Sequence, residues 1–120
     1  MNFQNTLNLF DPEREAKRIE QFIKEKKELT DSSTVVIGLS GGIDSSVTTA
    51  LSLRTLPGEE VEVLFLPEKS TPTRDTGDVK KLEQKFDFHA KKININGIVS
   101  TFEGKLGLEM TELSRANLKA

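Results

Sequence analysis

The most constraining feature of this sequence is a short loop rich in glycine and serine, residues 40–46, which reads Ser-Gly-Gly-Ile-Asp-Ser-Ser. A run of apolar and β-branched residues, 34–39, comes directly before it, and residues 45–55 follow with the composition of a helix. The apolar run is typical of a strand buried on both faces of a parallel sheet. The sequence therefore predicts a strand, a tight glycine loop and a helix in immediate succession.

Helices and strands are expected to alternate along the rest of the chain. The expected helices cover residues 11–29, 45–55, 75–86, 98–102 and 110–120. The expected strands cover residues 34–39, 61–66 and 89–95, and residues 68–74 and 103–109 are expected to be loop or irregular. Such alternation gives right-handed crossovers, and therefore an α/β fold with a parallel sheet and helices on both faces.

Periodicity also predicts which side chains pack. We expect the apolar residues of the first two helices and the spaced phenylalanines to face a core: Ala16, Ile19, Phe22, Ile23, Val47, Ala50, Leu51, Leu53, Phe65, Phe86 and Phe102. Residues 1–33 are interpreted as an N-terminal helical region and residues 34–120 as the beginning of a sheet domain. Three strands are fewer than the usual five or six, so we expect an incomplete sheet.

Composition excludes several classes of function. The net charge of -2 and the isoelectric point near 5.5 provide no basic field for a nucleic acid backbone. Absence of cysteine excludes disulfides, thiolate nucleophiles and cysteine zinc sites, and favours an intracellular protein. No stretch approaches the roughly 18 apolar residues of a membrane span, and the N-terminus has no targeting pattern. We expect a cytoplasmic protein without a nucleic acid or membrane partner.

The glycine loop (residues 40–46) has the chemistry of a phosphate site. A strand that turns directly into a helix gathers backbone N–H groups around a concavity at the positive end of the helix dipole. Glycines adopt positive φ and admit phosphate oxygens close to the backbone, while the hydroxyls of Ser40, Ser45 and Ser46 add donors. Asp44 would repel phosphates unless a hard cation lay between them, so we expect it to bind Mg²⁺.

Other interpretations of the loop fit less well. The Walker pattern needs a lysine before its Ser/Thr, and the dinucleotide pattern needs glycines at i, i+2 and i+5. Here no lysine lies between Gly38 and Ser46, and the glycines are at positions 38, 41 and 42. A strand-to-helix turn that binds nothing remains the structural alternative, although it would not require three serines, two glycines and an acid together.

The loop resembles the PP-loop of the ATP pyrophosphatase superfamily, which binds the pyrophosphate of ATP. This resemblance implies a Rossmann-like fold of the adenine nucleotide alpha hydrolase type, with ATP and Mg²⁺ as cofactors and Asp44 as a metal ligand. The residues that would contact ATP are Gly38, Leu39, Ser40, Gly41, Gly42, Ile43, Asp44, Ser45 and Ser46. Superfamily members include NAD, GMP, asparagine and argininosuccinate synthetases and tRNA-modifying enzymes.

Three further segments resemble the ammonia-dependent NAD synthetases. They are residues 66–75, residues 98–102 and residues 114–120, where Ala116 replaces the glycine of a family helix. The resemblance extends over nearly all of the chain after Asp11 but only about the first half of the family's usual length. It adds Arg74 as an ATP contact, with pairing to Asp75 or Asp78 as the alternative. Asn117 and Lys119 become candidate substrate contacts, or ordinary helix residues.

The resemblance implies a two-step reaction in a homodimer. The nicotinate carboxylate of deamido-NAD attacks ATP to form an acyl adenylate and pyrophosphate, and ammonia then displaces AMP to give NAD. Glutamine-dependent relatives release ammonia in an added domain that uses a cysteine, and the absence of cysteine here favours free ammonia. GMP synthetase is the alternative enzyme, and a truncated nucleotide-binding module without catalysis is the alternative of another class.

Overall fold

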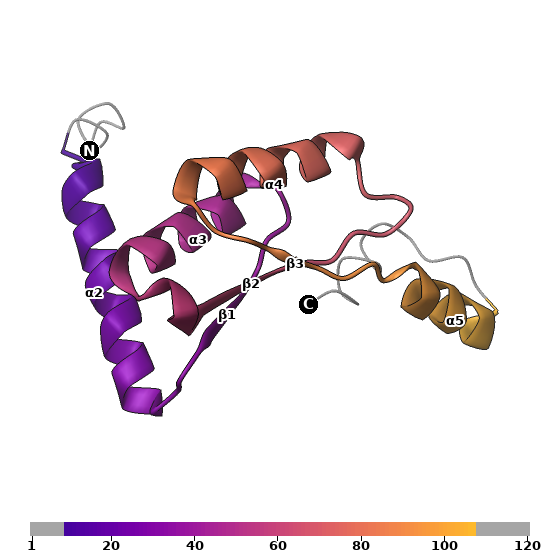
Figure 1. The fold of residues 1–120 in the computed structure, drawn as a ribbon, viewed down its shortest axis with the longest axis horizontal. Coiled ribbons are helices and arrows are strands. Elements are labelled where there is room, and N and C mark those ends of the chain that lie inside the picture. Colours follow the sequence, from indigo (N-terminus) through magenta and orange to yellow (C-terminus); the bar gives the residue numbers. More distant parts are fainter. Residues whose placement is uncertain (1–8, 108–120) are drawn as a thin grey trace.

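The computed structural model describes residues 9–107. Its helices are α2 (Pro12–Thr30), α3 (Ile43–Thr55), α4 (Thr73–Phe86) and α5 (Asn96–Leu106), with a 3-10 turn, η1, at Gly58–Glu60. Its strands are β1 (Val35–Gly38), β2 (Val61–Phe65) and β3 (Lys91–Lys92), all parallel and in the order β1-β2-β3 (Figure 1). The expected α/β fold with a parallel sheet is confirmed.

The sheet is longer at its carboxyl end than the formal strands. Beyond the paired residues, the N–H of Leu39 donates to the carbonyl of Leu64 at 2.8 Å. The N–H groups of Ile93 and Ile95 donate to the carbonyls of Phe65 and Pro67 at 2.9 and 3.0 Å. The strand expected over residues 89–95 is therefore short as an element, yet its pairing with β2 continues to Ile95.

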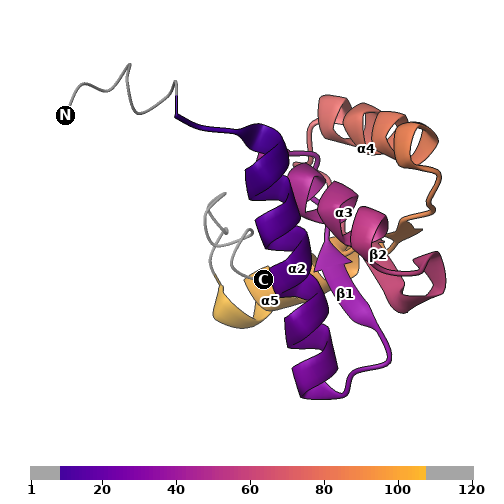
Figure 2. The same ribbon diagram turned by 90° about the vertical axis from the view of Figure 1, so that its left-hand side faces the viewer.

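The core lies between the sheet and the helices of one side. Leu39, Val63, Phe65 and Val79 form a buried cluster that joins β1, β2 and α4. Figures 1 and 2 show α3 and α4 on the same side of the strands, with α2 beside α3, whereas α5 lies beyond the carboxyl end of the sheet. Val36, on the other face of β1, is 59% exposed. The expectation that β1 is buried on both faces is wrong for the described residues, because no described helix covers Val36.

The first helix begins and ends where the sequence indicates. The carboxylate of Asp11 accepts hydrogen bonds from the N–H groups of Glu13 and Arg14, and Pro12 occupies the first turn. Asp31, with a φ of 51°, ends the helix in the left-handed conformation. Local chemistry alone is sufficient to define this element.

The orientation of α2 differs from the expected one. Ile19 and Phe22 are 45% and 58% exposed, while the half-buried positions are Glu15, Ala16, Glu20, Ile23 and Lys27. Ion pairs connect α2 to its neighbours: Arg54 of α3 contacts Glu13 and Glu20 at 3.2 and 3.1 Å, and Lys27 contacts Glu60 at 2.6 Å. Helical spacing identified the helix, but Ile19 and Phe22 do not pack as predicted.

Three other packing or boundary expectations are also corrected. Val47 and Phe102 are 48% and 42% exposed, whereas Leu51 and Val99, one turn away on the same helices, are buried. The expected irregular segment is helical as far as Leu106, and Gly107, with a φ of 65°, then ends α5. A single glycine at position 104 does not prevent this helix, since the cost of such a glycine is only about 1 kcal/mol.

Candidate functional site

The glycine loop connects the carboxyl end of β1 to the first turn of α3. Its sharpest constraint is Gly41, whose φ of 89° is a conformation that side chains of L residues rarely adopt. A Cβ at this position would lie 3.1 Å from both Cα and Cβ of Asp75 and 3.2 Å from its carbonyl oxygen. Backbone conformation and close packing therefore both require glycine here, and they place the loop against the first turn of α4.

Hydroxyl groups hold the loop in shape. Ser45 Oγ accepts from the N–H of Ser40 at 3.1 Å and lies 3.0 Å from Ser40 Oγ, which itself accepts from the N–H of Gly42 at 3.2 Å. Ser46 Oγ donates to the carbonyl of Gly42 at 2.6 Å. The three serines that were expected to face a phosphate are thus all brought together in this loop, where they also bond to the loop itself.

The start of α3 is open to an anion. Gly42 is the N-cap residue, and within residues 9–107 no side chain caps the first turn of α3. The N–H groups of that turn lie at the positive end of the helix dipole. An oxyanion placed there would gain both hydrogen bonds and favourable electrostatics.

Asp44 has the properties of a metal ligand that acts together with a bound phosphate. It is exposed in the first turn of α3, and its carboxylate forms no hydrogen bond or ion pair with the residues described here. Mg²⁺ commonly takes one or two carboxylates and completes its shell with phosphate oxygens and water. Across residues 9–107 no group of three or more potential ligands gathers, so the residues present fit a cation held mainly by phosphate and Asp44.

The flanking residues divide between core and surface. Leu39 is 2% exposed, so its side chain belongs to the core and only its backbone faces the loop. Gly38 is exposed, and a Cβ there would meet nothing within 4 Å. Ile43 is 79% exposed beside Asp44. Open space next to Gly38 and Ile43 leaves room for a ligand above the end of β1.

Arg74 lies in the first turn of α4, one residue from the contact between Asp75 and Gly41. Its side chain is exposed and, within residues 9–107, forms no ion pair with Asp75 or Asp78; Asp78 pairs with Lys81 instead. The proposed surface pairing is therefore wrong, while contact with a nucleotide remains a prediction. Asn117 and Lys119 lie outside the described residues.

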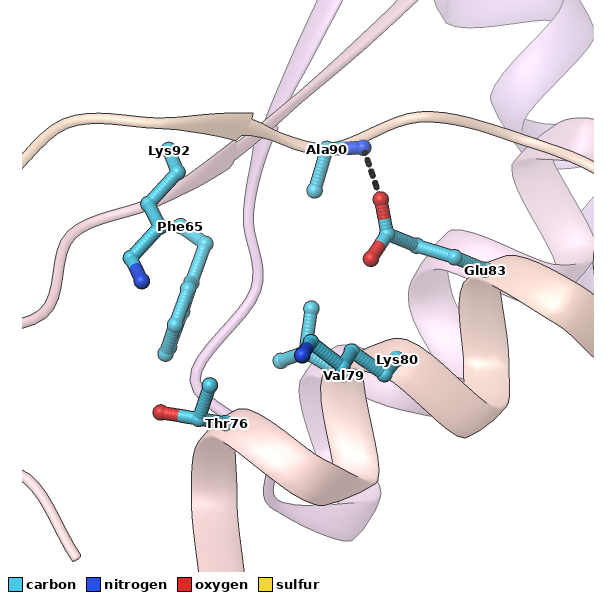
Figure 3. Close-up of a pocket in the computed structure, with 7 residues that line it drawn as sticks. All are labelled: Phe65, Thr76, Val79, Lys80, Glu83, Ala90 and Lys92. Carbon is cyan, nitrogen blue, oxygen red and sulfur yellow. Dashed lines mark hydrogen bonds between the residues drawn. The ribbon is translucent and has the colours of Figure 1, made fainter. Parts of the chain in front are cut away.

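A small cavity lies elsewhere in the described part of the chain, lined by other residues than those of the glycine loop. Its volume is about 60 Å³, and it lies between α4 and the strands β2 and β3. Figure 3 shows the residues that line it: Phe65, Thr76, Val79, Lys80, Glu83, Ala90 and Lys92. Glu83 Oε2 accepts from the N–H of Ala90 at 3.0 Å and closes one side. The cavity is far smaller than the roughly 300 Å³ that small-molecule sites occupy, so it is not a nucleotide site.

Two residues at the site escaped sequence reasoning. Asp75 was expected only as a surface partner of Arg74, yet its backbone forms the wall against Gly41. Asn96 drew no attention, yet Asn96 Oδ1 accepts from the N–H of Lys69 at 2.5 Å in the β2–α4 loop, residues 66–72. Neither contact has a sequence pattern, because each joins segments that are distant along the chain.

Comparison with known proteins identifies the family. The family model for NAD synthase matches residues 15–120. The chain belongs to this family. Within the NAD synthase family, NH(3)-dependent NAD(+) synthetase of Thermoplasma acidophilum is 38% identical over 78% of this chain, and that of Hyperthermus butylicus is 37% identical over 97%. The chain spans 37% and 42% of the length of these two relatives.

Solved structures of the NAD synthase family share the fold. An NH3-dependent NAD synthetase from Campylobacter jejuni superposes with a TM-score of 0.79 at 31% identity, over 92% of this chain and 48% of its own. An NMN synthetase from Francisella tularensis has the same TM-score at 25% identity, over 92% and 46% of the two chains. None of the helices within residues 9–107 has the length and apolarity needed to cross a membrane.

Proposed function

We propose that the protein makes NAD from deamido-NAD, ammonia and ATP. One observation carries the proposal: the glycine loop of a NAD synthase family member takes up the shape of an anion site at the start of α3. The helix that follows the loop begins without a side-chain cap, and Asp44 in its first turn has an unpaired carboxylate within residues 9–107. Gly41 has a positive φ and packs so closely against Asp75 that a larger residue would not fit. Each of these features suits the pyrophosphate of ATP.

The backbone from Gly38 to Ser46 and the hydroxyls of Ser40, Ser45 and Ser46 would bind the β- and γ-phosphates. Asp44 would hold Mg²⁺, which neutralises phosphate charge when it is bound. Arg74, from the neighbouring helix, would add a positive charge at the same end of the sheet. Asn117 and Lys119 would contact deamido-NAD.

The reaction proceeds through two displacements. A carboxylate oxygen of the nicotinate group attacks the α-phosphorus, the bond to the bridging oxygen breaks, and pyrophosphate leaves. Ammonia then attacks the acyl carbon, AMP leaves with the bonding electrons, and one proton is lost to give the amide. The residues of this chain bind and orient the phosphates and stabilise charge, and such positioning supplies most of the catalysis where no protein nucleophile is used.

The test is NAD formation by the product of the complete reading frame with ATP, Mg²⁺, ammonia and deamido-NAD. Asp44→Ala is expected to lower kcat/KM by about 100-fold or more, because one group that stabilises transition-state charge has this weight. Thr48→Ala, one turn further along α3, is the matched control and should retain activity. Folded protein that forms no NAD would refute the proposed function, and an active Asp44→Ala variant would refute the metal assignment.

The alternative substrate deserves a parallel assay because the NMN synthetase has the same TM-score as the NAD synthetase. Identity favours NAD synthesis, at 31% against 25% among the structures and 38% with a curated relative. Nicotinate mononucleotide and deamido-NAD should be compared at equal concentrations. A higher kcat/KM with nicotinate mononucleotide would refute deamido-NAD as the substrate. The proposed adenylation and attack by ammonia would still apply.

We also propose that the complete protein is a cytoplasmic homodimer. The observations that support the dimer are the membership of the NAD synthase family and the exposed apolar side chains Phe22, Val36 and Ile98, which an interface would cover. The cytoplasmic location rests on the sequence, which has no cysteine. Light scattering at increasing concentration provides the test. A monomer at the highest concentration would contradict the dimer.

A further inference from the structure

The β2–α4 loop is fastened to the start of α5 by two crossed hydrogen bonds. The N–H of Ile95 donates to the carbonyl of Pro67 at 3.0 Å, and the N–H of Lys69 donates to Asn96 Oδ1 at 2.5 Å. In the first bond the donor follows β3 and the acceptor is in the loop; in the second the donor is in the loop and the acceptor is in α5. Together they form a clamp between segments that are 27 residues apart in the sequence.

The side chain of Asn96 accepts the hydrogen bond from the N–H of Lys69 that a backbone carbonyl would accept if the strand continued. Parallel pairing with β2 continues through the N–H groups of Ile93 and Ile95, but the backbone turns into α5 at Asn96. Its carbonyl is then committed to the helix, where Ser100 is the residue four positions further on. The side-chain amide oxygen takes over as acceptor, so the ladder gains one more bond beyond the end of the strand.

A second set of hydrogen bonds holds residues 68–71 of the loop together. The N–H of Glu68 donates to Thr71 Oγ1 at 3.0 Å, and the N–H of Thr71 donates to the carbonyl of Glu68 at 2.9 Å. Glu68 is only 5% exposed although it is charged, and its carboxylate accepts from the hydroxyl of Ser70. The loop is therefore a compact turn held by hydrogen bonds among its own residues.

The far end of this turn is the start of α4, and the start of α4 touches the glycine loop. Pro72 is the N-cap of α4, and Asp75 in its first turn is the residue against which Gly41 packs. A continuous path of contacts thus leads from Asn96 through Lys69 and the compact turn to Asp75 and Gly41. Figure 1 shows these segments gathered at the carboxyl end of the sheet.

We propose that Asn96 is a positioning residue for the nucleotide site. It holds the β2–α4 loop so that the first turn of α4, with Arg74 and Asp75, sits against the glycine loop in the shape that receives phosphate. This inference rests on the proposed function for the identity of the ligand. The clamp itself does not, since it consists of hydrogen bonds within the chain.

The experiment compares three variants of the product of the complete reading frame. Asn96→Ala removes the acceptor, and Asn96→Asp keeps a carboxylate oxygen in the same place. Asn94→Ala is the matched control, because Asn94 Oδ1 accepts from the N–H of Asn96 at 2.9 Å and so supports the start of α5 without touching the loop. Two quantities are measured: amide hydrogen exchange at Lys69 by NMR, and the Kd of Mg·ATP by calorimetry.

Asn96→Ala is expected to speed exchange at Lys69 by about tenfold and to raise the Kd of Mg·ATP by a similar factor, since one hydrogen bond contributes about that much. Asn96→Asp should restore both values in 0.2 M salt, a concentration chosen as roughly sufficient to screen the added charge. Asn94→Ala should leave both near those of the unaltered protein. The melting temperature of each variant establishes that it is folded.

Unchanged exchange at Lys69 in Asn96→Ala would overturn the clamp. Faster exchange with an unchanged Kd, or an equal loss of affinity in Asn94→Ala, would overturn the positioning role. Protein that binds Mg·ATP but forms no NAD would refute the proposed function separately, because neither measured quantity depends on NAD formation.

Discussion

The glycine loop and the β2–α4 loop lie at neighbouring strand ends, but they are held in different ways. The glycine loop is shaped by its own residues, through bonds between Ser40, Gly42, Ser45 and Ser46 that span five positions or fewer. The β2–α4 loop depends on Asn96, which is 27 positions from its partner Lys69. Local sequence can therefore shape the glycine loop, while the position of the β2–α4 loop beside it requires the folded sheet.

The contact between Gly41 and Asp75 is where the two loops meet, and breaking it should have the largest effect on the folded chain. Gly41→Ala forces a side chain into a φ of 89° and against the backbone of Asp75. We expect the free energy of unfolding to fall by about 2 kcal/mol, and the affinity for Mg·ATP to fall by roughly tenfold or more as the phosphate donors shift. Urea unfolding and calorimetry measure the two effects.

Gly38→Ala is the control for that substitution, because its Cβ would meet nothing within 4 Å. Its free energy of unfolding should change by less than about 0.5 kcal/mol. A ligand that passes over Gly38 would still be obstructed, so a loss of ATP affinity without a loss of stability would support contact there. Equal destabilisation by the two substitutions would show that Gly41 has no special role.

A smaller effect is expected from the internal bonding of the glycine loop. Ser45→Ala removes the acceptor for the N–H of Ser40 and the contact between the two hydroxyls. The expected loss of stability is about 1 kcal/mol, with a weaker affinity for Mg·ATP. Thr48→Ala is the control, since Thr48 Oγ1 bonds only back to the carbonyl of Asp44 on an exposed face. A variant at Ser45 that behaves like the one at Thr48 would contradict a loop held by its own hydroxyls.

The matching bond in the β2–α4 loop should matter least for affinity. Thr71→Val removes the hydroxyl that accepts from the N–H of Glu68 at 3.0 Å, a bond of the same kind as that between Ser40 and Ser45. Stability should fall by about 1 kcal/mol or less, and exchange at Glu68 should speed up. Because the Asn96 clamp remains, the Kd of Mg·ATP should change less than in Ser45→Ala. A larger change in the Kd of Mg·ATP would show that Thr71, and not Asn96, holds the loop in the shape that binds the nucleotide.

Prediction from the sequence succeeded where the cause was local. The succession of β1, the glycine loop and α3 follows from β-branched residues, glycines and helical spacing within about 20 positions. The ends of α2 follow from Asp11, Pro12 and Asp31. Prediction failed for Ile19 and Phe22, which are exposed, because the side of α2 that packs depends on its contacts with α3, and helical spacing within α2 does not encode them.

The sequence by itself predicted an α/β protein with a glycine loop between its first strand and the following helix, and it singled out Asp44 as the one acid of that loop. These conclusions rest on backbone conformation and short-range hydrogen bonding, which neighbouring residues control. Only the tertiary structure decided that Asp75 forms the wall behind Gly41 and that Asn96 holds Lys69. Those contacts arise when parallel pairing brings distant strand ends together, and no local pattern encodes them.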